Sequence, residues 1–192
     1  VDADYSQVEL RVLAHMSGDE NMIDAFKHGE DIHSKTASQI FDVDIKDVTS
    51  KQRIEAKAIN FGIIYGKTDF GLSQDLNIPV ATAKAYIDSY FNKYPKIKEF
   101  MDEAVESATE TGYATTILNR RRYIPEIKAS NFIVRNQGKR FAMNAPIQGS
   151  AADIIKVAMV NVYNKLKENN MKSKLILQVH DELIVEAVYE EL

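Results

Sequence analysis

Two runs near the C-terminus, residues 175–179 and 183–185, consist of long aliphatic and β-branched residues apart from Gln178, and they predict two buried strands. Three ionisable residues stand between these runs: His180, Asp181 and Glu182. Burying a charge without a partner is expensive, so strand propensity alone does not explain this charged centre. Either Asp181 is a turn residue at the tip of a hairpin, or the charges form part of a site.

Helical spacing dominates the chain between a short strand predicted for residues 1–5 and the two C-terminal strands. Capping residues, prolines and apolar periodicity predict helices from about residue 6, over 20–29 after Asp19, over 32–41 after Asp31, over 51–66 after Thr49 or Ser50, over 80–94 after Pro79, and over 96–111 after Pro95. Residues 113–125 predict a hairpin around Asn119 and Arg120. A long helix from about 130 to 169 is expected to be interrupted near Pro146, because proline lacks the amide hydrogen. This order predicts an α+β fold with a helical subdomain inserted between strands.

The two aspartates at the strand ends, Asp4 and Asp181, are candidate metal ligands. If their strands are neighbours in one sheet, the carboxylates could converge on Mg²⁺, which binds one or two carboxylates together with water and substrate phosphate. Two such ions would activate an attacking hydroxyl and stabilise the leaving phosphate oxygen. For either aspartate alone, a role as a cap or turn residue remains the alternative.

Two helical stripes combine residue types that suit a nucleic acid or a nucleotide. Residues spaced by four lie on one slowly winding face of a helix. The first stripe mixes cations with aromatic rings: Arg53, Lys57, Phe61 and Tyr65. The second carries groups that contact phosphates, sugars or base edges: Arg140, Asn144 and Gln148. On spacing alone, the favoured explanation is an amphipathic helix with solvated cations and core aromatic rings for the first stripe, and a polar surface stripe for the second.

The charge is distributed unevenly along the chain. The 24 lysines and arginines against 28 acidic residues give a net charge of -4, yet residues 119–140 hold seven basic residues and one acidic residue. A polyanion is the simplest partner for this basic segment, and a solvated loop is the alternative. The chain has no cysteine, which excludes disulfides and thiolate metal sites. No apolar run approaches the ~20 residues of a membrane span, and the first residues lack the basic region and apolar core that are typical of a signal peptide.

Three segments, "DYSQVELR", "RIEAKAINFGIIYG" and "QVHDELIVE", closely resemble in this order the three polymerase motifs of family A DNA polymerases, the bacterial DNA polymerase I type. The segment "RFAMNAPIQGSAAD" resembles the run that precedes the last motif of that family. The resemblance covers essentially all 192 residues. It implies template-directed addition of deoxynucleotides to a primer 3′ end, in DNA replication and repair.

The resemblance also implies which residues act. The catalytic set would be Asp4, Asp181, Glu182 and Lys57, and two Mg²⁺ ions would be held by Asp4, Asp181 and the backbone carbonyl of Tyr5. Glu9 would be the steric gate against a ribose 2′-hydroxyl. The nucleotide-binding set would be Arg53, Lys57, Phe61, Tyr65, His33, Glu9 and Gln7. The DNA-binding set would be Arg140, Asn144, Gln148 and His180.

The fold implied by the resemblance is a polymerase right hand without its thumb, in which a large helical fingers subdomain is inserted into an antiparallel palm sheet. Residues 1–18 and 130–192 would belong to the palm, and residues 19–129 to the fingers. The chain would then be a fragment with weak or no activity by itself. We expect primer–template DNA and deoxynucleoside triphosphates as partners, no membrane, a monomer, and a cytoplasmic, nucleoid-associated location in a bacterial or phage-infected cell.

Two alternatives remain open from the sequence. A single-subunit RNA polymerase has a related palm, although Glu9 as a gate argues against it. A non-catalytic nucleic-acid-binding module is the second, and primer extension with Mg²⁺ separates it from an enzyme.

Overall fold

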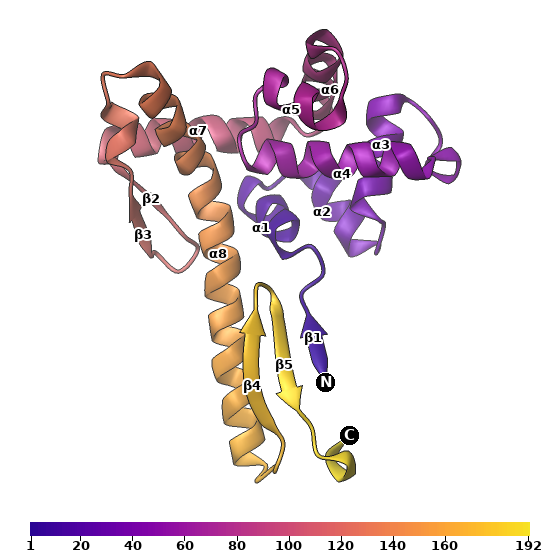
Figure 1. Cartoon of the computed structure of the whole chain (residues 1–192), viewed down its shortest axis with the longest axis vertical. Helices are drawn as coiled ribbons and strands as arrows, with labels where there is room; N and C mark the ends of the chain where they lie inside the picture. Colours follow the sequence, from indigo (N-terminus) through magenta and orange to yellow (C-terminus); the bar gives the residue numbers. More distant parts are fainter.

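The computed structural model describes residues 1–192 and shows helices gathered around one half of a long helix, α8, with a small sheet beside the other half (Figure 1). The helices are α1 (Val8–Ser17), α2 (Glu20–Lys27), α3 (Ile32–Phe41), α4 (Ser50–Ile64), α5 (Asp69–Leu76), α6 (Val80–Lys93), α7 (Pro95–Thr111) and α8 (Phe132–Glu168). The strands are β1 (Asp2–Asp4), β2 (Tyr113–Thr115), β3 (Arg121–Tyr123), β4 (Lys174–Val179) and β5 (Glu182–Glu186). Short 3₁₀ turns cover Ile45–Asp47, Pro125–Lys128 and Tyr189–Glu191. The fold is therefore rich in helix with small antiparallel sheets.

Local side-chain caps explain where several helices begin. The carboxylate of Asp19 accepts a hydrogen bond from the Met22 amide at the start of α2. Asp31 caps α3 in the same way. At α4, Thr49 and Gln52 form a reciprocal capping box, which satisfies amides that the helix itself cannot. The predicted starts of these helices are confirmed.

Helix α5 was not predicted from the sequence, because its apolar residues show no clear period. Thr68 caps it through the Gly71 amide, and Leu72 is its buried anchor. A short helix of this kind owes its stability to packing on its neighbours rather than to intrinsic propensity.

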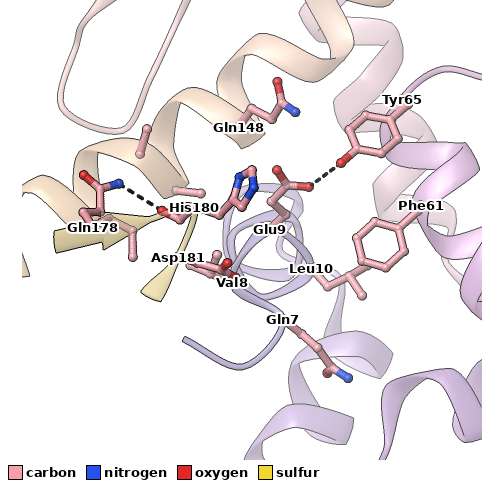
Figure 2. Close-up of a pocket in the computed structure, with 13 residues that line it drawn as sticks. Gln7, Val8, Glu9, Leu10, Phe61, Tyr65, Gln148, Gln178, His180 and Asp181 are labelled. Atoms are coloured by element: carbon pink, nitrogen blue, oxygen red, sulfur yellow. Dashed lines mark hydrogen bonds between the residues drawn. The ribbon is translucent and has the colours of Figure 1, made fainter. Parts of the chain in front are cut away.

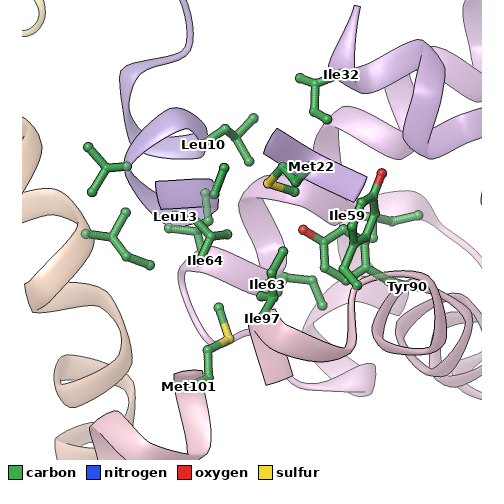
Figure 3. Packing of buried hydrophobic residues seen from close by; sticks show 14 of the residues in the cluster. Leu10, Leu13, Met22, Ile32, Ile59, Ile63, Ile64, Tyr90, Ile97 and Met101 are labelled. Carbon is green, nitrogen blue, oxygen red and sulfur yellow. The ribbon is translucent and has the colours of Figure 1, made fainter. Parts of the chain in front are cut away.

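One main core of 19 buried residues joins all eight helices, and Figure 3 shows much of it. Leu10 and Leu13 of α1 and Ile59, Ile63 and Ile64 of α4 all belong to this core. A second cluster of 6 buried residues lies between α7, the β2–β3 hairpin and the first half of α8. The pocket described below therefore rests on a packed helical scaffold on one side.

Helix α8 runs unbroken from Phe132 to Glu168, so the expected interruption near Pro146 is wrong. Proline removes one backbone donor, but Ala145, Pro146 and Ile147 are all buried against other elements. That packing holds the segment helical despite one missing hydrogen bond.

The larger sheet has the antiparallel order β1-β5-β4, so the first and last strands of the chain are neighbours in space. Strand β5 packs inward through Leu183. Strand β4 does not match the expected buried strand, because Ile176 is 57% and Leu177 52% exposed. Its register shifts between Leu175 and Leu177, which leaves Ile176 as the extra residue of a bulge. Strand β4 lies beside α8, and Figure 1 shows no other helix next to β4 and β5.

The second sheet is the predicted hairpin β2–β3, whose loop holds Asn119 in a left-handed conformation at φ 61°. Its arginine side chains pack back onto the molecule. Arg120 donates to the Asp153 carboxylate at 2.8 Å and to the Gly149 carbonyl at 2.8 Å, which ties the hairpin to α8. No helix of the chain has both the length and the apolarity needed to cross a bilayer.

Candidate active site

A pocket of about 550 Å³ lies where α1, the end of α4, the middle of α8 and the β4–β5 turn meet. Predicted site residues from segments far apart in the sequence line it together (Figure 2). They are Gln7, Glu9, Phe61, Tyr65, Gln148, His180 and Asp181. The pocket also has apolar walls, among them Val8, Leu10 and Ile155, which the sequence did not single out. A concave, partly apolar pocket with a few converging polar groups is the usual form of a ligand site.

The centre of the pocket is a hydrogen bond from the Tyr65 hydroxyl to Glu9 Oε2 at 3.2 Å (Figure 2). Burial raises the pKa of Glu9 above its ordinary value; the Tyr65 hydrogen bond lowers it, and the charge of Asp181 raises it again. Burial and the neighbouring Glu9 charge raise the pKa of Tyr65, so its hydroxyl stays protonated and donates. The carboxylate of Glu9 thus lies between a hydrogen-bond donor, Tyr65 at the end of α4, and a second negative charge, Asp181 of the β4–β5 hairpin.

The aromatic half of the α4 stripe faces this pocket. The rings of Phe61 and Tyr65 are nearly parallel, with an interplanar angle of 19° and centroids 6.3 Å apart. His33 of α3 continues the row, with its ring centroid 6.0 Å from that of Phe61. Flat rings in a row offer stacking surfaces for a sugar or a base.

The cationic half of the stripe lies nearer the start of α4 and does not line the pocket. Arg53 donates from Nε and Nη2 to one oxygen of Asp31, at 2.9 and 2.6 Å, and Lys57 is exposed. Burial alone would raise the pKa of Asp31. The hydrogen bonds from Arg53 and from the Ser34 and His33 amides, together with the charge of Arg53, outweigh burial and lower the pKa below its ordinary value. The cations and the aromatic rings therefore follow one another along a single helix face that leads into the pocket.

The sheet brings the predicted metal ligands onto neighbouring strands. Asp4 lies directly opposite Glu182 in the register of β1 and β5, and the Tyr5 amide donates to the Asp181 carbonyl at 3.2 Å. Opposite residues of an antiparallel pair project from the same face, so Asp4 shares its face with Glu182. Asp181 belongs to the two-residue turn that precedes Glu182, beside His180, whose φ is 50°.

These oxygen donors suit a hard cation such as Mg²⁺. The chain does not gather three or more His, Asp or Glu side chains into a ready-made metal cage. Such a cage is not what Mg²⁺ requires, because it is commonly bound by one or two carboxylates together with waters and substrate phosphates. Asp4, Asp181 and Glu182 therefore fit the ion by their chemistry, with Asp4 and Glu182 opposite each other on adjoining strands and Asp181 in the turn directly before Glu182.

The stripe on α8 is only partly in the pocket. Gln148 lines it, whereas Arg140 and Asn144 lie further toward the start of α8. Gly66, which follows α4, packs closely on this part of α8: a Cβ there would lie 2.6 Å from Met143 Cε and 3.2 Å from Arg140 Cγ. Its φ of 62° also favours glycine. Gly66 thus lies close against Met143 and Arg140 of α8, and its place after a helical pattern was the only sequence signal for it.

A second concavity of about 230 Å³ adjoins the pocket and shares Gln148 with it. Its basic wall consists of Arg120, Arg121 and Arg122 of the β2–β3 hairpin. Arg121 lies over the ring of Tyr113, with its guanidinium carbon 4.6 Å from the ring centroid. Three of the seven basic residues of segment 119–140 therefore line one concavity, although their side chains remain exposed to solvent.

Comparison with known proteins agrees with this arrangement. DNA polymerase family A matches residues 1–192, and the chain belongs to this family. DNA polymerase I of Caldicellulosiruptor bescii is 58% identical over 191 residues, and DNA polymerase I of Geobacillus stearothermophilus is 55% identical over 190 residues. The alignments cover 100% and 99% of this chain, but the chain spans only 22% of each of these relatives.

A solved structure has the same fold. The POL domain of Pol1 from M. smegmatis, in complex with a DNA primer-template and dNTP, superposes with a TM-score of 0.96 at 46% identity. That match covers 99% of this chain and 34% of the other. The chain thus has the fold of one part of a polymerase domain.

Proposed function

We propose that this chain provides the nucleotide site and most of the catalytic centre of a DNA-directed DNA polymerase. The observation that carries this proposal is the single pocket in which Glu9, Tyr65, Gln148 and Asp181 meet from four separate elements. The solved relative was bound to primer-template DNA and dNTP, which supports the same partners here. In this proposal the chain works as a monomer, with residues 1–18 and 130–192 in the palm and residues 19–129 in the fingers.

The reaction would be attack of a primer 3′-hydroxyl on the α-phosphate of a deoxynucleoside triphosphate, with release of pyrophosphate. Two Mg²⁺ ions held by Asp4, Asp181 and the Tyr5 carbonyl would activate the hydroxyl and stabilise charge on the phosphate oxygens. Glu182, beside Asp4 in the sheet, would add negative charge to this cation site. Catalysis by this chain would consist mainly of positioning and electrostatic stabilisation.

The α4 face would bind the nucleotide along its length. Arg53, Lys57 and His33 would contact the triphosphate, and Lys57 would donate a proton to the leaving pyrophosphate. Phe61 and Tyr65 would pack on the sugar and at the template position. The order of these residues along α4 supports this assignment: the cations come first and the aromatic rings follow. A nucleotide has the same order, with charged phosphates at one end and a flat base at the other.

The remaining site residues would contact the sugar of the nucleotide and the DNA. Glu9, held by Tyr65 in the middle of the pocket, would exclude a ribose 2′-hydroxyl, and Gln7 would lie near the primer end. Gln148 and His180 line the same pocket and would contact the terminal base pair, with Arg140 and Asn144 further along the duplex. Salt would weaken such binding, because phosphate contacts release counterions.

Primer extension with and without Mg²⁺ tests the catalytic assignment. We expect Asp4→Ala and Asp181→Ala each to reduce extension at least about a hundredfold, as loss of a key electrostatic group does, with folding unchanged by circular dichroism. Asp2→Ala is the matched control, because Asp2 is an exposed aspartate on the same strand but lies opposite Ile184.

Because the chain spans 22% of its relatives, each variant should be assayed twice. One assay uses the chain itself, and the other uses DNA polymerase I of Geobacillus stearothermophilus with its matching stretch replaced by this chain. Extension that survives Asp181→Ala in the chimera would refute the metal assignment. Equal use of ribonucleotides and deoxynucleotides would instead favour an RNA polymerase, and DNA binding without extension in the chimera would favour a binding module.

A further inference from the structure

A buried polar cluster lies beside the nucleotide-binding face of α4, and three of its four members have no role in the site described above. The cluster, here called the α3–α4 polar cluster, consists of His33, Thr36, Asn60 and Tyr94. Asn60, Thr36 and Tyr94 are fully buried, and His33 is 3% exposed. Buried polar groups of this kind need complete hydrogen bonding, so the network constrains which atom carries each hydrogen.

The hydrogen bonds of the cluster have a consistent direction. Asn60 Nδ2 lies 3.2 Å from Thr36 Oγ1 and 3.1 Å from His33 Nδ1, so its two hydrogens serve these two acceptors. Thr36 Oγ1 donates to Asn60 Oδ1 at 3.3 Å. Because this uses the single hydroxyl hydrogen of Thr36, its contact with the Tyr94 hydroxyl at 3.5 Å has Tyr94 as the donor. Burial raises the pKa of Tyr94 to about 12, which keeps that donor protonated.

This direction fixes the tautomer of His33. A ring nitrogen that accepts a hydrogen bond carries no proton, so a neutral His33 must hold its proton on Nε2. Nε2 has no hydrogen-bond partner in the chain, and it is not among the fully enclosed polar atoms. The N–H therefore has no partner within the chain, and the ring centroid of His33 lies 6.0 Å from that of Phe61.

The surroundings keep His33 neutral as well as oriented. Burial lowers the pKa of His33 below its ordinary value; the charge of Asp31 raises it, and those of Arg53 and Lys57 lower it. At neutral pH the ring is an uncharged donor beside two cations. Such a donor adds a directed hydrogen bond to an anion without repelling Arg53 and Lys57.

We propose that Asn60 is a positioning residue, which holds His33 in the tautomer protonated at Nε2 and so presents one N–H donor to a phosphate oxygen of the bound nucleotide. Thr36 and Tyr94 hold the Asn60 amide in the orientation that this requires. The identity of the ligand rests on the function proposed above, whereas the tautomer depends on the network alone.

The tautomer is measured by nitrogen NMR of the histidine rings in the ¹⁵N-labelled chain at neutral pH. We expect His33 to show an unprotonated Nδ1 and a protonated Nε2. His28 is an internal control for the opposite pattern, because its Nδ1 lies 2.8 Å from the Asp24 carbonyl and must donate to it. A His33 spectrum with the proton on Nδ1 would overturn the proposal.

The variant Asn60→Asp tests the cause, because a carboxylate only accepts and must draw the proton to Nδ1. We expect the His33 Nδ1 signal to move into the protonated range, and the dissociation constant for dATP to rise about tenfold, as expected for losing a hydrogen bond to a charged group. Gln52→Glu, which adds the same charge at the capping box of α4, should leave both unchanged. An unaltered His33 spectrum in folded Asn60→Asp would overturn the positioning role.

A second pair of variants guards against misfolding of Asn60→Asp. Thr36→Ser keeps the hydroxyl and should keep the wild-type His33 spectrum, whereas Thr36→Val should broaden or shift it because Asn60 loses its support. Identical spectra for the two would contradict the proposal. A failure of the proposed function looks different: the wild-type tautomer is present, yet dATP neither binds nor shifts the His33 Nε2 signal.

Discussion

At the residue scale, the candidate site depends on a few ionisable groups whose behaviour is set by their immediate neighbours. Glu9 is the clearest case, since burial, the Tyr65 hydrogen bond and the Asp181 charge all act on one carboxylate. Its raised pKa means that the folded chain binds this proton more tightly than the unfolded chain. Glu9 therefore makes the free energy of unfolding fall as pH rises from the ordinary value of 4.5 through the raised pKa.

The variant Tyr65→Phe tests this balance. The hydrogen bond from Tyr65 is the largest influence that lowers the Glu9 pKa, so its removal should raise that pKa further while burial and Asp181 stay in place. An NMR titration of the Glu9 carboxyl carbon, in wild type and variant, measures the change. Tyr163→Phe, on an exposed part of α8, is the control. A Glu9 pKa that stays the same or falls in Tyr65→Phe would show that the hydrogen bond does not stabilise the carboxylate.

At the element scale, glycines decide how closely neighbouring elements approach α8. Gly138 lies inside α8 under the 3₁₀ turn Pro125–Lys128. A Cβ at this position would lie 2.6 Å from the Ile127 Cα and 2.7 Å from the Glu126 carbonyl carbon. These are backbone atoms, which cannot turn away as a flexible side chain can. The turn can therefore rest on α8 only where a side chain is missing.

We expect Gly138→Ala to lower the free energy of unfolding by about 1–3 kcal/mol, the range for overpacking a well-packed site. Gly62→Ala is the matched control, because Gly62 also lies inside a helix but a Cβ there would meet its nearest atom, Leu72 Cδ1, at 3.7 Å. That control should gain about 0.5–1 kcal/mol from helix propensity. Urea denaturation of both variants measures the difference, and equal stability of the two would contradict the close approach at Gly138.

At the scale of the whole molecule, the candidate site joins a well-packed part to a thinly packed one. Phe61 and Tyr65 stand on α4, which contributes Ile59, Ile63 and Ile64 to the main core. Asp181 stands on the β4–β5 hairpin, whose strand β4 has its long aliphatic side chains largely in solvent. The two halves of the site therefore differ in how many buried apolar side chains hold them in place.

Native-state hydrogen exchange should show this difference. We expect the opening free energy for exchange to be lower for the amides of β4 than for those of the Ile59–Ile64 stretch of α4. The reason is that few buried apolar contacts hold the hairpin in place. The exchange free energies of the two segments are compared in one sample at several low urea concentrations. Equal values for β4 and α4 would mean that the sheet and the helical core unfold as one unit.

The sequence by itself determined the features that depend on contacts within a few residues. Caps such as Asp19, Asp31 and Thr49 bond to amides two or three positions away, so the pattern alone located the starts of α2, α3 and α4. The same holds for the hairpin around Asn119, and the three motifs identified the family.

The tertiary structure alone decided everything that depends on distant neighbours. The buried surroundings of Pro146 keep α8 continuous, and packing of Leu72 stabilises α5 where no periodicity predicted a helix. The register of β1 and β5 puts Asp4 opposite Glu182 rather than Asp181. Of the two polar stripes, only the ends with Phe61, Tyr65 and Gln148 reach the pocket. Helical spacing specifies which side chains share a face, but what that face meets depends on long-range packing, which no local pattern records.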